Sequence, residues 1–328
     1  MIEKHYLLPD RWVQKWPALQ KIFWALEAFI LRLAMWFMRL FSMQRGYDLA
    51  VGLCRLVEPF TPFTDKFERN LLIAFPEISR PEIRKIAVDT CANIGKALAD
   101  LVLAKRIWKE REERIEFVTL GETNPPFEPG RPVVLVTAHI GAWQLASFVV
   151  ARHKMSMVSV YAPEANPFLH KLVNNLRADL HSGFVPKKGC MRELMSTLKR
   201  GDVVGFVPDL RMDGGAQLPL FDVNTPSNTT AARLALHHGC ELVPVHAERL
   251  PGCRFKITTY PPIRADDQNA SVEEQARQMT QKQLALFETW IRDTPDQWLC
   301  VGRRWEEHVY DRRPNALNVS SHLDFANK

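Results

Sequence analysis

Short runs of β-branched and aromatic residues alternate with longer helical segments after residue 131 of the chain. This alternation restricts the fold, because strands separated by helices pair into a sheet whose faces the helices cover. The runs with strand character are 133–137, 157–161, 203–207, 242–247 and 255–260. The segments with helical character are 167–180, 190–199 and 229–238, and a capping box at Ser271 and Glu274 predicts one more helix, to about residue 291. The sequence therefore predicts an α/β fold with a mixed central sheet covered by helices.

The part of the chain before residue 121 has a helical pattern instead. Apolar residues recur at helical spacing between Pro81 and Trp108, and a loop at 121–132 with four prolines and two glycines ends this part. We therefore expect a first helical segment, a main domain made of a helical and an α/β part, and a loose tail. Their expected bounds are 1–58 for the first segment, 59–313 for the main domain (59–120 helical, 131–313 α/β) and 314–328 for the tail.

The first segment contains an apolar stretch at 22–43 that charged residues interrupt. Glu27, Arg32 and Arg39 lie within it, and each charge near a bilayer centre costs about 2.5–3.5 kcal/mol, which opposes a simple membrane span. On a helical wheel Lys21, Arg32 and Arg39 fall within about 20° of one another. This pattern predicts an amphipathic helix that anchors the protein on an anionic membrane surface. The alternative is a buried first helix of the globular domain.

The charge and the cysteines restrict the partners and the compartment. The formal net charge of +6 favours anionic partners such as phospholipid headgroups, phosphorylated glycans, an acidic carrier protein or nucleic acid. Nucleic acid is disfavoured, because the basic residues are dispersed and form no known binding module. The six cysteines form no paired motif, which predicts a reducing compartment and no zinc site. Residues 1–21 contain no apolar core of a secretory signal.

A histidine follows the first predicted strand of the α/β part. His139 would lie at the carboxyl edge of the sheet, where α/β proteins usually place their sites. Histidine takes a proton from a hydroxyl near pH 7, which suits a general base for acyl transfer. Gln144 would lie in the first turn of a helix that starts near Ala142, and it would face back to hold the imidazole ring. Taken alone, this pair of residues is more typical of a structural histidine than of a catalytic one.

Further short blocks follow in a fixed order along the chain. They are Arg69-Asn70-Leu71 with Phe75-Pro76-Glu77, His139 to Gln144, Val160-Tyr161 with Asn166-Pro167 and Arg177, Leu198 to Asp202 leading into Gly205 to Asp209, Thr229-Thr230, Leu242 to Val245, and Gln297-Trp298-Leu299 with Arg303-Arg304-Trp305. In this order, from about residue 67 to 305, the chain resembles the bacterial lipid A late acyltransferases (lauroyl and myristoyl transferases) of the lysophospholipid acyltransferase superfamily. His139 to Gln144 occupies the position of that family's His-x4-Asp/Glu motif.

The resemblance implies an acyltransferase domain at 59–313. It implies transfer of a fatty acyl chain from acyl carrier protein to a hydroxyl of a phosphorylated glycolipid, a lipid A precursor, at the cytoplasmic face of the inner membrane. No metal or other cofactor is implied. Asp209, Arg177 and Tyr161 match blocks that would bind the substrate, although Asp209 also suits a turn after a strand and Arg177 an ordinary helix surface. Arg303 and Arg304 suit either an anionic headgroup or a solvated basic run.

Two positions depart from the pattern of that family. Gln144 replaces the acidic residue of the motif, and Ala162 stands where an arginine is expected after Tyr161. A glutamine oxygen accepts a hydrogen bond but offers no negative charge to an imidazolium. Gln144 therefore indicates a slower natural enzyme, a carboxylate supplied from elsewhere, or an engineered substitution, and Gln144→Glu is expected to raise the rate. The alternatives for the whole protein are an acyltransferase for another membrane lipid, such as a lysophospholipid or mannosylated lipid, and a catalytically impaired lipid-binding homologue.

Overall fold

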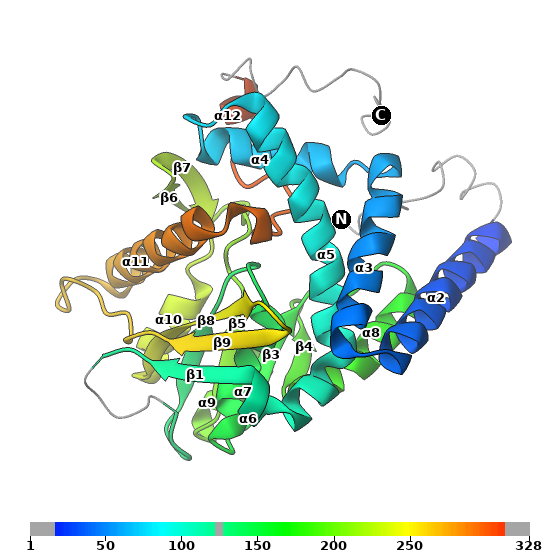
Figure 1. Cartoon of the computed structure of the whole chain (residues 1–328). Helices are drawn as coiled ribbons and strands as arrows, with labels where there is room; N and C mark the ends of the chain where they lie inside the picture. The colour runs from blue at the N-terminus through cyan, green and yellow to red at the C-terminus, as the bar shows by residue number, and fades with distance from the viewer. Residues whose placement is uncertain (1–16, 122–126, 312–328) are drawn as a thin grey trace.

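A seven-stranded sheet forms the centre of the protein in the computed structural model, which describes residues 17–121 and 127–311 (Figure 1). The strand order is β1-β9-β8-β2-β5-β3-β4. The bounds are β1 Ile115–Thr119, β2 Val133–Val136, β3 Met157–Tyr161, β4 Gly183–Pro186, β5 Val203–Phe206, β8 Glu241–Leu250 and β9 Arg254–Thr259. Every neighbouring pair is parallel except β8 with β9, so the sheet is mixed, as the sequence predicts. A separate hairpin consists of β6 (Ala216–Leu220) and β7 (Val223–Ser227).

The two central strands are buried on both faces of the sheet. Val133 and Leu135 of β2 point into one hydrophobic core, and Val134 and Val136 point into the other, because side chains alternate along a strand. All four residues of β2 and of β5 are buried, which explains why these runs are continuously apolar rather than alternating with polar residues. Strands β1 and β4, which lie at the two edges, were not predicted.

Helices cover both faces of the sheet, and the long helix α5 serves both cores. Its first half contributes to the core that contains α4, α9, α10 and α11, and its second half to the core that contains α3, α7 and α8. The bounds are α3 Met43–Val57, α4 Phe63–Ala74, α5 Arg80–Lys109, α6 Arg111–Arg114, α7 Ser147–Arg152, α8 Pro167–Arg177, α9 Met191–Lys199, α10 Thr230–His238, α11 Val272–Asp293 and α12 Glu307–Asp311. Short 3₁₀ turns are η1 Glu58–Phe60, η2 Trp143–Ala146, η3 Ala178–Leu180 and η4 Pro295–Gln297. The helix predicted after the capping box is confirmed as α11, where the Ser271 hydroxyl accepts from the Glu274 amide.

Helix α2 (Pro17–Leu40) lies at one side of the molecule beside α3 and α8 (Figure 1). Met35 and Met38 are buried against the body of the protein, and the Glu27 carboxylate accepts a 3.0 Å hydrogen bond from the Asn166 side chain at the start of α8. The opposite side of α2 remains exposed and apolar. Across the described ranges, no helix combines the length and the apolar character needed to cross a bilayer. The tail predicted at 314–328 lies outside the described residues.

Candidate active site

The turn after β2 places His139 at the carboxyl edge of the sheet. Gly141 adopts a φ of +57°, and a Cβ on it would lie 2.4 Å from the carbonyl oxygen of Ala247, so the turn requires glycine. The Ala142 amide donates to that same carbonyl at 2.8 Å, which fixes the turn against β8. The α-helix that we expected from Ala142 is instead the 3₁₀ turn η2, and α7 begins only at Ser147.

The imidazole of His139 contacts a buried carboxylate from the turn that follows the neighbouring strand, β5. Its Nδ1 lies 2.7 Å from Oδ1 of Asp209, whose side chain is 2% exposed, whereas the histidine side chain is 26% exposed. The two residues are far apart in sequence, but β2 and β5 are adjacent and parallel, so their following loops meet at one edge. An ionised carboxylate only accepts hydrogen bonds, so Nδ1 carries the proton and Nε2 keeps its free lone pair.

Gln144 does not hold the imidazole ring, contrary to the sequence-based interpretation. Its Oε1 atom is buried without a hydrogen-bond partner among the described residues, and Asp209 occupies the Nδ1 side of His139. The physical reason is the backbone: residues 143–146 form a 3₁₀ turn, so Gln144 does not project back as it would from the first turn of an α-helix. The ring of Trp143 lies beside the imidazole instead, with 5.4 Å between centroids.

A segment near the carboxyl end of the chain holds both members of this pair. We call residues 298–305 the C-terminal strap. Trp298 pairs with Ile140 as an isolated bridge, and the Leu299 amide donates to the carbonyl of His139 at 2.8 Å. The Trp298 indole donates to Oδ2 of Asp209 at 3.3 Å. The strap therefore fixes the backbone of the histidine and the second oxygen of its carboxylate partner.

The strap is itself tied to the amino-terminal half of the chain by Asn70. The Asn70 amide donates to the carbonyls of Cys300 and Gly302, and its oxygen accepts from the Tyr310 hydroxyl at 2.6 Å and from the Arg304 amide. The resemblance identified the sequence blocks that contain Asn70 and Trp298, but the sequence assigned no role to either residue. The order of the blocks along the chain is the only feature of the sequence that drew attention to them.

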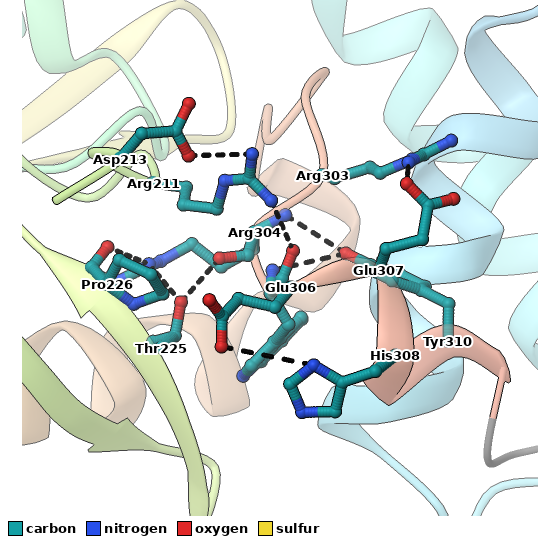
Figure 2. A network of polar contacts seen from close by, with 11 residues as sticks. Arg211, Asp213, Thr225, Pro226, Arg303, Arg304, Glu306, Glu307, His308 and Tyr310 are labelled. Carbon is teal, nitrogen blue, oxygen red and sulfur yellow. Dashed lines mark hydrogen bonds and ion pairs between the residues drawn. The ribbon is translucent and has the colours of Figure 1, made fainter.

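The two arginines of the strap differ sharply in environment (Figure 2). Arg303 is exposed and forms an ion pair with Glu307. Arg304 is completely buried, and Figure 2 shows its guanidinium directed at Thr225 and Pro226 rather than at solvent. The interpretation of this pair as an exposed headgroup site is therefore wrong for Arg304.

Arg177 and Tyr161 lie together at the end of β3, in a cluster of their own. The Arg177 guanidinium sits over the Tyr161 ring, 4.5 Å from its centroid, and forms a 2.6 Å ion pair with Glu164. His170 stacks on the same tyrosine and contacts the other Glu164 oxygen at 2.8 Å. Glu164 thus already compensates the charge of Arg177. No contact between described residues joins this cluster directly to His139 or Asp209, so their predicted role in binding substrate stays a prediction.

Residues 17–121 and 127–311 contain no group of three or more His, Cys, Asp or Glu residues that could hold a metal ion. The site consists of a partly exposed histidine, a buried carboxylate and an indole that contacts this carboxylate. This arrangement can take a proton from a hydroxyl and return it to a leaving group.

The chain is similar to known acyltransferases of lipid A biosynthesis. The chain is 27% identical over 271 residues to the lipid A biosynthesis lauroyltransferase of Escherichia coli K12, covering 79% of this chain and 85% of the relative. It is 24% identical over 267 residues to the lipid A biosynthesis palmitoleoyltransferase of the same organism, covering 79% and 84%. A solved structure, the 1-acyl-sn-glycerophosphate acyltransferase of Thermotoga maritima, matches with a TM-score of 0.35 at 16% identity and covers 83% of this chain and 97% of that one. The model of the bacterial lipid A biosynthesis acyltransferase family matches residues 15–307, and the chain therefore belongs to this family.

Proposed function

We propose that this protein is an O-acyltransferase that moves a fatty acyl chain from acyl carrier protein to a hydroxyl of a phosphorylated glycolipid, a lipid A precursor, with His139 as the general base. The observation that carries the proposal is the 2.7 Å contact between His139 Nδ1 and the buried Asp209 carboxylate at the carboxyl edge of the sheet. Membership of the lipid A biosynthesis acyltransferase family supports both the reaction and the class of acceptor.

The proposed reaction uses the free Nε2 atom of His139. The acceptor hydroxyl gives its proton to Nε2 while its oxygen attacks the carbonyl carbon of the acyl thioester, and a carbon–oxygen bond forms. The tetrahedral intermediate then collapses, the carbon–sulfur bond breaks, and the imidazolium returns the proton to the carrier thiolate. Asp209 stabilises the imidazolium in between, because its negative charge faces the protonated ring. The products are the acylated lipid and the free thiol of the carrier.

Gln144 has no part in this proton path. Of the three interpretations of this substitution, the contact between His139 and Asp209 supports a carboxylate supplied from elsewhere. The same contact argues against the impaired lipid-binding homologue, because the histidine keeps an anionic partner. We therefore propose a functional acyltransferase despite the missing motif acid.

We also propose that α2 lies on the membrane surface at the cytoplasmic face of the inner membrane. The helix has three sides: one buried on the protein, one apolar and exposed, and a basic stripe of Lys21, Arg32 and Arg39 between them. A stripe in this position can reach anionic headgroups while the apolar side enters the bilayer boundary. The exposed apolar residues of α2 and of the adjoining α3 and η1 are Ile22, Phe23, Leu26, Phe29, Ile30, Leu33, Trp36, Phe37, Leu40, Leu53, Leu56, Val57 and Phe60.

The function is tested by acyl transfer from labelled acyl carrier protein to a panel of acceptors. The panel contains a phosphorylated lipid A precursor, a lysophospholipid and a mannosylated lipid. We expect transfer to the lipid A precursor and loss of activity in His139→Ala. An active His139→Ala variant would refute the mechanism. Transfer only to another acceptor would replace the proposed substrate, and inactivity of both the wild type and Gln144→Glu on every acceptor would favour a binding protein.

The membrane contact is tested by flotation with vesicles of phosphatidylglycerol and phosphatidylcholine. Trp36→Glu, on the exposed side of α2, should weaken binding, whereas Val272→Glu, equally apolar and exposed at the start of α11, should leave it unchanged. Arg32→Gln should weaken binding to the anionic vesicles alone. Equal binding of all variants would contradict the proposed orientation.

A further inference from the structure

The loop that joins β3 to α8 has its apolar side chains outside and its polar side chains inside. Its exposed residues are Ala162, Pro163, Ala165, Pro167 and Phe168. Its two polar residues, Glu164 and Asn166, are partly and fully buried. Continuous exposed apolar surface of this kind marks a contact with a protein or a membrane. The outer side of loop 162–168 therefore suits an apolar partner better than water.

Specific contacts hold the two polar side chains of the loop inward. Glu164 forms a 2.6 Å ion pair with Arg177. The Asn166 side chain caps α8, because its oxygen accepts from the Phe168 amide at 2.9 Å, and its NH₂ group donates to the carbonyl of Trp24 in α2 at 3.1 Å. The fold itself thus turns the apolar side of the loop outward.

The same asparagine joins the loop to the exposed side of α2. Helices α2 and α8 lie side by side (Figure 1), and Asn166 contacts α2 at both Trp24 and Glu27. Phe23 and Leu26, the residues that precede these two in the chain, are exposed. The apolar surface of α2 therefore continues onto loop 162–168.

Exposed apolar residues also lie between this loop and the catalytic pair. Strand β5 lies between β3 and β2 in the sheet, and all three strands are parallel, so their following loops share one edge. Directly after Asp209, the loop that follows β5 exposes Leu210 by 40% and Met212 by 44%. We call loop 162–168 together with Leu210 and Met212 the apolar edge. This surface extends from α2 to the carboxylate that contacts His139.

Two lysines lie beside the apolar edge. Lys187 and Lys188 follow β4, and the Lys187 amide donates to the carbonyl of Tyr161 at 2.9 Å, immediately before loop 162–168. Both lysines are exposed, and neither forms an ion pair with a described residue. Lysines beside apolar residues suit an anionic membrane surface, where each one adds affinity. An acidic protein would also attract lysines, but the continuity with the apolar side of α2 favours a bilayer.

We propose that the carboxyl edge of the sheet is a second membrane contact, in addition to α2. The apolar edge enters the interface of an anionic bilayer, and Lys187 and Lys188 bind its headgroups. His139 then faces the leaflet, and a lipid acceptor can reach it without leaving the bilayer completely. This delivery of the acceptor rests on the proposed function, whereas the contact with the bilayer does not.

Flotation with vesicles of phosphatidylglycerol and phosphatidylcholine tests the contact with the full chain. Phe168 is 47% exposed, so Phe168→Glu should fold normally and weaken binding about fivefold or more. The matched control is Leu120→Glu. Leu120 is 43% exposed and follows β1, whose carboxyl end lies at the opposite edge of the sheet because β9 runs antiparallel to β8. Equal binding of the two variants would overturn the proposal.

The role of the lysines is tested with two exposed lysines near opposite ends of α9. Lys188→Gln should weaken binding to the anionic vesicles about fivefold and leave binding to pure phosphatidylcholine unchanged. Lys199→Gln, at the far end of the helix, should leave both unchanged. Equal losses in the two variants would refute a headgroup contact at this edge.

Amide hydrogen exchange distinguishes a bilayer from a protein partner. Vesicles should slow exchange in peptides that cover 162–168 and 210–212, and they should not slow exchange around Leu120. If acyl carrier protein slows exchange in the first two peptides and vesicles do not, the edge is a protein-docking surface and the proposal is wrong.

The second contact and the proposed function fail in distinguishable ways. Weakened flotation of Phe168→Glu together with an active His139→Ala variant would keep the contact and refute the proposed mechanism. Normal flotation of Phe168→Glu together with an inactive His139→Ala variant would refute the contact and keep the mechanism. If Trp36→Glu weakens flotation and Phe168→Glu does not, α2 is the membrane contact and the apolar edge is not.

Discussion

Replacing Asp209 with asparagine should nearly abolish activity, and the indole of Trp298 explains why. The indole N–H can only donate, and it points at Oδ2 of Asp209. In the variant it selects the amide orientation that presents oxygen to Trp298 and NH₂ to His139. Nδ1 of the histidine must then accept a hydrogen bond, the proton moves to Nε2, and Nε2 can no longer take a proton from the substrate.

The size of this loss follows from two separate effects. In the Ser-His-Asp template the equivalent change to asparagine costs about 10⁴ in rate, mainly through the wrong tautomer, which corresponds to about 5 kcal/mol at 1.36 kcal/mol per tenfold. The opposite amide orientation in the Asp209→Asn variant would restore the tautomer with the proton on Nδ1 of His139. It would also place the amide NH₂ against the indole N–H of Trp298, and leaving these two buried donors unpaired costs about 1–3 kcal/mol. Asp209→Asn with Trp298→Phe removes that conflict. This double variant should therefore be about ten to a hundred times faster than Asp209→Asn alone.

The assay is transfer of a labelled acyl chain from acyl carrier protein to the lipid acceptor under single-turnover conditions, so that product release does not hide the chemical step. Trp298→Phe alone should cost less than about tenfold, because it removes one long hydrogen bond to an ionised carboxylate. An Asp209→Asn variant that retains more than a tenth of the wild-type rate would refute the role of the carboxylate. A double variant slower than Asp209→Asn would refute the selection of the amide orientation.

Three further changes have expected outcomes. Gln144→Glu should not raise the rate, in contrast to the sequence-based expectation, because a carboxylate already faces the histidine; it should lower the melting temperature, since the Oε1 site is buried without a partner. Gly141→Ala should lower the free energy of unfolding, measured in urea, by about 2–4 kcal/mol, because alanine is strained in a left-handed backbone and its Cβ would clash with the Ala247 carbonyl. Gly239→Ala has a similar φ but open space around the added Cβ, so it should lower the free energy of unfolding by only about 1 kcal/mol. Burial lowers the pKa of His246 to about 4, below its unfolded value near 6.5, so the unfolded state binds more protons between these pH values. The free energy of unfolding should therefore fall by about 3 kcal/mol as the pH falls from 6.5 to 4. If His246→Phe loses the same stability over this pH range, His246 is not the cause.

The strands could be predicted, but their order could not. Continuous apolar runs identified β2 and β5 to within one residue, because burial on both faces leaves a clear pattern. The chain passes from β2 to β3, yet β5 lies between them in the sheet. Sequence spacing therefore favoured Gln144, five positions from His139, over Asp209, which only the strand order brings close. The burial of Arg304 was equally hidden, since its hydrogen-bond partners come from β7 and from the other half of the chain.

The strand order also gives a physical reason for glutamine at position 144. The site already contains a buried carboxylate, which contacts the imidazole of His139 and accepts a hydrogen bond from the Trp298 indole. A second carboxylate at position 144, where the side-chain oxygen has no partner, would either bury an uncompensated charge or stay protonated. An amide carries no such charge. With the partner of the histidine supplied by the loop after β5, Gln144 is compatible with an active site rather than a sign of a lost one.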